Sequence, residues 1–280
     1  MTLVIAHRGA SASRPEQTRA AYEYALEIGA DGVECDVRLT ADRHVVCVHD
    51  PTVDRTSDGH GLVHEFTLDQ LRELDFSAEN HDHGRGELVT LAELIDLLLG
   101  SGRPVVLAIE LKHPNPFDLD LERTVLQVLD TAGWDSRTAR LGDVTISLMS
   151  FNPASVAALA PEVHARHVML LTAEIELGDI AGDVAAAGGG EDVRAQLQRA
   201  LEIGREMIDN GIVGGAGPEL DLVLGQPESV RGWVQAGLTV RVWTVDTVEA
   251  IEACLRVGAQ EITTNDPVFV RAYLDQARGR

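Results

Sequence analysis

The chain has 280 residues, of which 45% are hydrophobic, and this is enough for one large domain with a substantial core. Its 23 basic and 45 acidic residues give a formal net charge of −22, which repels polyanions and argues against nucleic acid as a partner. The sequence predicts a cytoplasmic protein without stable membrane insertion. Its three cysteines lack disulfide or zinc spacing, no apolar run approaches the roughly 18 residues of a membrane span, and no leader precedes the first strand-like run.

Short β-rich apolar runs alternate along the chain with segments of helical period. One helical segment, residues 19–31, places Ala21, Ala25 and Ile28 on a single stripe. Strands that alternate with helices predict an α/β fold, here a (β/α)8 TIM barrel that occupies residues 1–280 as a single domain. The eight runs interpreted as strands are 3–7, 32–37, 104–111, 144–149, 167–171, 211–215, 238–245 and 261–264.

The interval between the second and third of these strands is longer than a simple barrel connection requires. It contains another strand-like run at 44–49, a polar stretch and a helical run at 90–100. The excess predicts a small insertion after the second barrel strand, at about 44–89, on the face where TIM barrels carry their active sites. We interpret His81 and His83, within this insertion, as part of a solvated loop tip rather than a metal site.

Two other glycine-rich stretches are interpreted as connections. Residues 211–221 lack the Walker pattern of a phosphate-binding loop, so we expect a strand that ends in a turn. Residues 182–192 read as a surface loop.

Carboxylates recur at alternate positions of two predicted strands. Side chains two apart on a strand share a face, so Glu34 and Asp36 point the same way, as do Glu110 and Lys112. Three carboxylates on inward faces of neighbouring strands can hold a hard divalent cation through oxygen, and Mg²⁺ or Ca²⁺ is more natural there than Zn²⁺. The alternative is a structural salt-bridge network of the same residues with Arg8.

Two histidines end apolar strand-like runs and are each followed by a charged residue. His7 precedes Arg8, and His49 precedes Asp50. A pair of imidazoles with pKa values near neutrality can act as general base and general acid on opposite sides of a reacting centre. Cationic side chains such as Arg8 and Lys112 can stabilise charge on phosphate oxygens.

Five blocks of the sequence, in order, resemble the signature blocks of the glycerophosphodiester phosphodiesterase family: "HRGASASRPEQT", "GVECDVRLTADRHVVCVHDPTVDRTSDGHG", "AIELK", "VRVWTV" and "ITTNDP". The resemblance implies a barrel that uses a divalent metal ion, Mg²⁺ or Ca²⁺, to hydrolyse small-molecule glycerophosphodiesters to an alcohol and glycerol 3-phosphate. It implies that His7 and His49 are the acid/base pair, that Glu34, Asp36 and Glu110 are metal ligands, and that Arg8, Lys112 and Trp243 contact substrate, the last beside its glycerol moiety.

One position departs from the family pattern. Gln17 occupies a position where the family usually has asparagine, which puts in doubt the hydrogen bond that asparagine makes beside the metal site. We expect Pro15 to open the first helix and Glu16 to lie in its first turn, with an outer metal ligand as the alternative role of Glu16.

Two alternative functions remain open from the sequence. The same site could hydrolyse lysophospholipids, in the manner of a lysophospholipase D, although aromatic residues make up only 4% of the chain and no aromatic-rich lipid-binding segment is obvious. A catalytically silent barrel that only binds a phosphorylated ligand is the second alternative, but it would be expected to have lost a key histidine or carboxylate.

Overall fold

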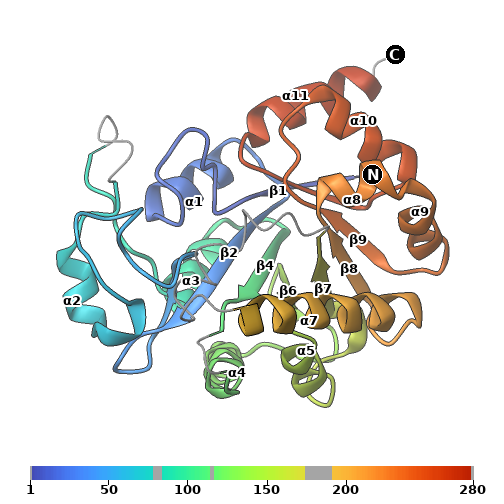
Figure 1. The fold of residues 1–280 in the computed structure, drawn as a ribbon. Coiled ribbons are helices and arrows are strands. Elements are labelled where there is room, and N and C mark those ends of the chain that lie inside the picture. The colour runs from blue at the N-terminus through green and yellow to red at the C-terminus, as the bar shows by residue number, and fades with distance from the viewer. Residues whose placement is uncertain (1, 78–83, 114–116, 174–190, 279–280) are drawn as a thin grey trace.

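A computed structural model describes residues 2–77, 84–113, 117–173 and 191–278. Its strands form one sheet in which β1 (Leu3–Ala6) pairs with both β2 (Gly32–Leu39) and β10 (Glu261–Thr264), so the sheet closes on itself. The barrel strands between β2 and β10 are β4 (Val105–Leu111), β6 (Val144–Ser150), β7 (Val168–Thr172), β8 (Gly215–Pro218) and β9 (Thr239–Val242). Because all eight run parallel, the predicted (β/α)8 barrel is confirmed (Figure 1).

Helices connect successive strands and cover the outside of the barrel (Figure 1). Several begin at a threonine whose hydroxyl accepts a backbone N–H of the first turn, as Thr18, Thr90 and Thr247 do. The helices in chain order are α1 (Arg19–Glu27), α3 (Leu91–Gly100), α4 (Asp120–Ala132), α5 (Pro153–Leu159), α7 (Glu191–Asp209), α8 (Leu220–Gly225), α9 (Pro227–Gln235), α10 (Val248–Val257) and α11 (Pro267–Arg278).

The long connection between β2 and α3 forms a small unit of its own beside the barrel. It contains β3 (Val45–Cys47), which pairs antiparallel with β2, and the short helices η1 (Val63–Glu65) and α2 (Leu68–Glu73). These elements pack around a separate hydrophobic cluster that includes Val46, Val53, Leu71 and Phe76. The insertion after the second strand is therefore present, while His81 and His83 lie outside the described residues.

The predicted strand at 211–215 is wrong in its bounds, because the strand begins where the prediction ends. Gly211 has φ +65° and lies in the turn after α7, while Gly214 passes so close to Arg166 that a Cβ would lie 2.4 Å from its Cα. Only residues 215–218 are extended and paired. The expected turn therefore precedes the strand instead of following it. The surface loop expected at 182–192 lies almost wholly outside the described residues.

Successive side chains along each barrel strand point alternately into the barrel and outward into the layer beneath the helices. Ile5, Ala108, Met149 and Met169 fill the middle of the barrel, and below them the 2% exposed Arg241 pairs with Glu261 at 2.5 Å and donates to Ser147 at 3.0 Å. The interior is thus closed by packed side chains, as is usual in such barrels. Polar side chains with the same inward orientation gather at the carboxyl ends of the strands.

Candidate active site

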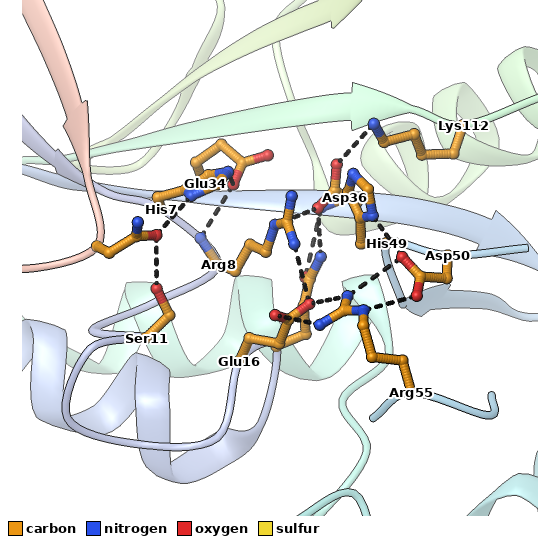
Figure 2. Close-up of polar contacts among 12 residues, drawn as sticks. His7, Arg8, Ser11, Glu16, Glu34, Asp36, His49, Asp50, Arg55 and Lys112 are labelled. Atoms are coloured by element: carbon orange, nitrogen blue, oxygen red, sulfur yellow. Dashed lines mark hydrogen bonds and ion pairs between the residues drawn. The ribbon is translucent and has the colours of Figure 1, made fainter. Parts of the chain in front are cut away.

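The ends of β1, β2, β3 and β4 bring seven of the eight predicted site residues into one cluster, and Figure 2 shows six of them, all but Glu110. Inward positions of β2 carry Glu34 and Asp36, as their alternation with buried Val33 and Val37 predicted. Glu110 lies on β4, which neighbours β2 with Asp36 opposite Glu110 in the register. The remaining members of the cluster lie within two residues of the ends of strands β1, β3 and β4: His7, Arg8, His49 and Lys112.

The three carboxylates Glu34, Asp36 and Glu110 form a compact buried group. One oxygen atom from each lies within 4.8 Å of the other two, and all three side chains are buried. Burial, together with repulsion from its two neighbours, raises the pKa of Glu34 well above its usual range, and burial raises that of Glu110 to about 7. Burial also opposes ionisation of Asp36, but attraction from Lys112, His49 and Arg8 outweighs it, so the pKa of Asp36 is lowered.

This group has the chemistry of a cation site. Its donors are carboxylate oxygens, and within the described part of the chain the buried Oε1 of Glu34 has no hydrogen-bond partner. A divalent cation would neutralise the mutual repulsion and use the unpaired oxygen. The residues present therefore fit a metal ion bound through oxygen.

Two cationic side chains flank the carboxylates. The Nζ of Lys112 lies 2.6 Å from Glu110 Oε1 and 3.5 Å from Asp36 Oδ1. Arg8 approaches from the opposite side, where its Nε lies 3.3 Å from Asp36 Oδ2, and its φ of +56° turns the chain sharply after β1. Both cations are only partly covered, so they can also contact an anion that enters the mouth of the barrel.

The two histidines differ in their partners. His7 Nδ1 lies 2.7 Å from Asn265 Oδ1, whereas His49 Nδ1 lies 2.7 Å from the Asp50 carboxylate. Burial and the nearby Arg8 lower the pKa of His7 to about 4, and burial and Lys112 also lower the pKa of His49. The sequence does not reveal how completely the His7 ring is buried, and burial is the main cause of its lowered pKa.

Gln17 is buried and reaches the site in spite of the change from the usual asparagine. Its Nε2 donates to Asp36 Oδ2 at 2.6 Å, and its Oε1 accepts the hydroxyl of Tyr22 at 2.7 Å. The residue has φ +61°, a conformation that side chains other than glycine and asparagine rarely adopt. The hydrogen bond beside the predicted metal ligands is therefore made by the longer side chain.

The expectations for Pro15 and Glu16 are wrong, because α1 begins at Arg19 after the Thr18 cap. Glu16 instead lies between two arginines, 3.1 Å from Arg8 Nη1 and 2.8 and 2.9 Å from Arg55.

Arg55 also binds both oxygens of Asp50, at 2.7 and 3.1 Å. A continuous chain of ion pairs therefore runs from Arg8 through Glu16 and Arg55 to Asp50, which is hydrogen-bonded to His49 (Figure 2).

Trp243 lies apart from this cluster, at the end of β9. Its indole Nε1 donates to Gly217 O at 2.8 Å, and its ring meets that of Phe151 edge-on with the centroids 5.6 Å apart. Phe151 in turn lies 5.8 Å from Lys112 Nζ, so these two aromatic rings connect Trp243 with the charged cluster. Beside Trp243 is a cavity of about 320 Å³ that is also lined by Glu219, Leu220, Asp221 and Thr244.

The model of the glycerophosphoryl diester phosphodiesterase family matches residues 7–268, and so spans nearly the whole chain. This chain belongs to that family. The match includes both histidines, the carboxylate group and Trp243, the residues on which the resemblance in the sequence rested.

Individual relatives agree with the family match. The probable glycerophosphodiester phosphodiesterase 1 of Mycobacterium tuberculosis is 38% identical over 98% of this chain and 93% of its own. The glycerophosphodiester phosphodiesterase of Caldanaerobacter subterraneus is 31% identical over 95% of each chain. An Oleispira antarctica phosphodiesterase solved with the product sn-glycerol-3-phosphate is 23% identical and has a TM-score of 0.74 over 98% of this chain and 97% of that one, a likeness of fold.

Several residues of the site were missed in the sequence, notably Asn265, Asp246 and Ser11. None is part of a strand alternation, and the block "ITTNDP" that contains Asn265 carries the family resemblance without marking that residue. Glu16 was expected only at the start of a helix or as an outer metal ligand, because its contact with Arg55 joins segments 39 residues apart, which no local period reveals. Among the described residues, no helix is both long and apolar enough to cross a membrane.

Proposed function

We propose that this protein hydrolyses glycerophosphodiesters to an alcohol and glycerol 3-phosphate with the help of a divalent cation. The observation that carries the proposal is the cluster of three buried carboxylates, two cations and two histidines at the carboxyl end of the barrel. Membership of the family supports the reaction, and the product bound to the Oleispira antarctica enzyme supports the identity of the phosphate ester.

Glu34, Asp36 and Glu110 would hold the cation. Carboxylate oxygens favour Mg²⁺ or Ca²⁺ over softer metals, and the unpaired Oε1 of Glu34 supports a ligand in addition to the contacts within the described chain. When bound, such an ion supplies charge that stabilises the phosphate oxygens in the transition state. Arg8 and Lys112, on either side of Asp36, would contact the remaining phosphate oxygens.

His7 and His49 would move the protons. Burial lowers the pKa values of both rings, which favours the neutral form that can accept a proton at Nε2. The Asp50 carboxylate stabilises the cationic form of His49, which makes His49 the better proton donor to the leaving group. His7, whose Nδ1 partner is a neutral amide, has no such stabilisation and stays unprotonated, so it is the ring available to accept a proton.

Trp243 and the cavity beside it would receive the organic part of the substrate. A volume of about 320 Å³ suits glycerol or a small alcohol. Two of the residues that line it, Glu219 and Asp221, are acidic, which favours a small polar substrate over the acyl chain of a lysophospholipid. The presence of both histidines and all three carboxylates in one cluster speaks against a catalytically silent barrel.

A small glycerophosphodiester is thus the proposed partner. Buried free thiols at Cys35, Cys47 and Cys254 support a reducing, cytoplasmic location.

The test is a coupled assay of glycerol 3-phosphate release over a panel of glycerophosphodiesters and lysophospholipids. EDTA should abolish activity and Mg²⁺, Ca²⁺ or Mn²⁺ should restore it. His7→Ala and His49→Ala should each lower turnover by at least about 10²-fold, while the surface control His64→Ala should not. Activity that survives both chelation and loss of either histidine would refute the proposal.

A further inference from the structure

A chain of hydrogen bonds behind His7 connects three neighbouring strands. His7 follows β1, Asn265 follows β10 and Asp246 lies shortly after β9. Because β10 pairs with both β1 and β9, the ends of these strands are adjacent, and the backbone N–H of His7 donates to Thr264 O at 2.8 Å. The rigid barrel therefore places Asn265 between Asp246 and the imidazole.

Asp246 determines the orientation of the Asn265 amide. An ionised carboxylate only accepts hydrogen bonds. Asp246 accepts the Thr264 hydroxyl at 2.7 Å, the Asn265 backbone N–H at 2.9 Å and the Asn265 Nδ2 amide at 2.6 Å. The Nδ2 group must therefore point to Asp246, which leaves Oδ1 directed at His7 and at the hydroxyl of Ser11, 3.0 Å away.

The orientation of the amide fixes the tautomer of His7. Asn265 Oδ1 can only accept, so the proton of the neutral imidazole must be on Nδ1, 2.7 Å away. The lone pair is then on Nε2, the nitrogen that lies 4.0 Å from Glu34 Oε2 and faces the carboxylate group.

We propose that Asp246 and Asn265 are positioning residues that hold His7 as the Nδ1–H tautomer, with the basic Nε2 directed into the site. The role of His7 as a proton acceptor rests on the proposed function, whereas the tautomer can be measured without any substrate.

The arrangement differs from that of His49, which meets a carboxylate directly. At His7 a neutral amide stands between the ring and Asp246, so the tautomer is fixed without a further negative charge in contact with the imidazole next to Glu34. This feature makes His7 a proton acceptor whose ring orientation is set in advance of substrate binding.

The first experiment is ¹⁵N NMR on protein labelled at histidine, with His7 assigned by the signal that disappears in His7→Ala. In the wild type the neutral His7 ring should carry its proton on Nδ1. In Asn265→Ala the signal should move to a mixture of tautomers, while Asn210→Ala, at an exposed asparagine, should leave it unchanged. A wild-type ring protonated on Nε2 would overturn the proposal.

The second experiment exchanges the side chains of Asn265 and Asp246. Asn265→Asp alone places two carboxylates in contact and should lower kcat by about 10- to 100-fold with little change in KM. In the double variant Asn265→Asp, Asp246→Asn, the amide at 246 can donate to the carboxylate at 265, which still accepts from His7. It should recover most of the lost kcat and the Nδ1–H tautomer.

The outcomes separate the two proposals. If both single variants retain wild-type kcat and tautomer, or if the double variant is no better than Asn265→Asp while its melting temperature matches the wild type, the positioning role is wrong. If the wild type hydrolyses no glycerophosphodiester but shows the predicted tautomer and its loss in Asn265→Ala, the proposed function fails and the hydrogen-bond chain stands.

Discussion

Replacing Glu34 with glutamine separates a metal site from a structural salt-bridge network. Glutamine keeps the size of the side chain and an oxygen that can accept the Arg8 backbone N–H, which lies 3.0 Å from Glu34 Oε2. It removes an ionisable carboxyl from a buried group of three, in which burial and mutual repulsion already oppose ionisation of Glu34. Without metal, the variant should therefore be as stable as the wild type or more stable.

The magnitudes follow from the geometry of that group. At the 4.8 Å upper limit of their separation, two ionised carboxylates of this group repel by about 3.5 kcal/mol at an effective dielectric constant of about 20, and Arg8 offsets part of this repulsion. A cation at about 100 times its Kd should stabilise the wild type by about 2.7 kcal/mol, or raise its Tm by about 5–10 °C. A structural ion pair that loses one buried partner would instead destabilise the protein by about 3–5 kcal/mol.

Thermal melts in EDTA and with added Mg²⁺ or Ca²⁺ measure both effects on the wild type and Glu34→Gln. We expect the metal-dependent rise in Tm to fall by more than half in the variant, while its Tm in EDTA is unchanged or higher. A variant that melts several degrees lower in EDTA and still gains the full rise from metal would refute the reasoning and support the salt-bridge network.

Three further predictions concern the surroundings of the carboxylates. Burial raises the pKa of Glu110 to about 7, so between about pH 4.5 and 7 the native state keeps a proton on Glu110 that the unfolded state loses. The contribution of Glu110 to the free energy of unfolding therefore falls as the pH rises through this range. In EDTA, the free energy of unfolding measured with urea should rise for Glu110→Gln relative to the wild type over that pH range, by at most about 3 kcal/mol. A difference between the two proteins that stays constant with pH would contradict this expectation. Gln17→Leu leaves the buried Tyr22 hydroxyl without its acceptor and should cost about 1–3 kcal/mol in the same measurement, much of it recovered when Tyr22→Phe is added. Arg55→Lys loses the planar guanidinium that binds Glu16 and Asp50 together, and it should lower kcat about 10- to 100-fold, whereas the surface variant Arg137→Lys should not. A kcat of Arg55→Lys equal to that of the wild type would show that the guanidinium is dispensable.

The architecture and the centre of the site were predictable because both follow from strand period. Alternation alone places Glu34 with Asp36 and Glu110 with Lys112 on inward faces, and the barrel then brings the strands together. The strand at 215–218 was displaced in the prediction because a glycine-rich segment has no side-chain period to mark its start.

The second layer of the site was not predictable from the sequence. Asn265 meets His7 across 258 positions, and Glu16 meets Arg55 across 39, so each contact depends on how loops from different strands come together. The positive φ of Gln17 is equally invisible, because glutamine does not signal that conformation. The burial of His7, which governs its pKa, is a property of the finished fold.

The packed interior of the barrel has a consequence for turnover. Arg241, Glu261 and the apolar layer around Met149 close the axis below the carboxylates, so the described part of the chain leaves no route through the barrel. Substrate, water and both products must then use the same opening. A phosphorylated product that stayed on Arg8 and Lys112, the proposed phosphate contacts, would block the next substrate, and its departure would become a step that can limit the rate of the whole cycle.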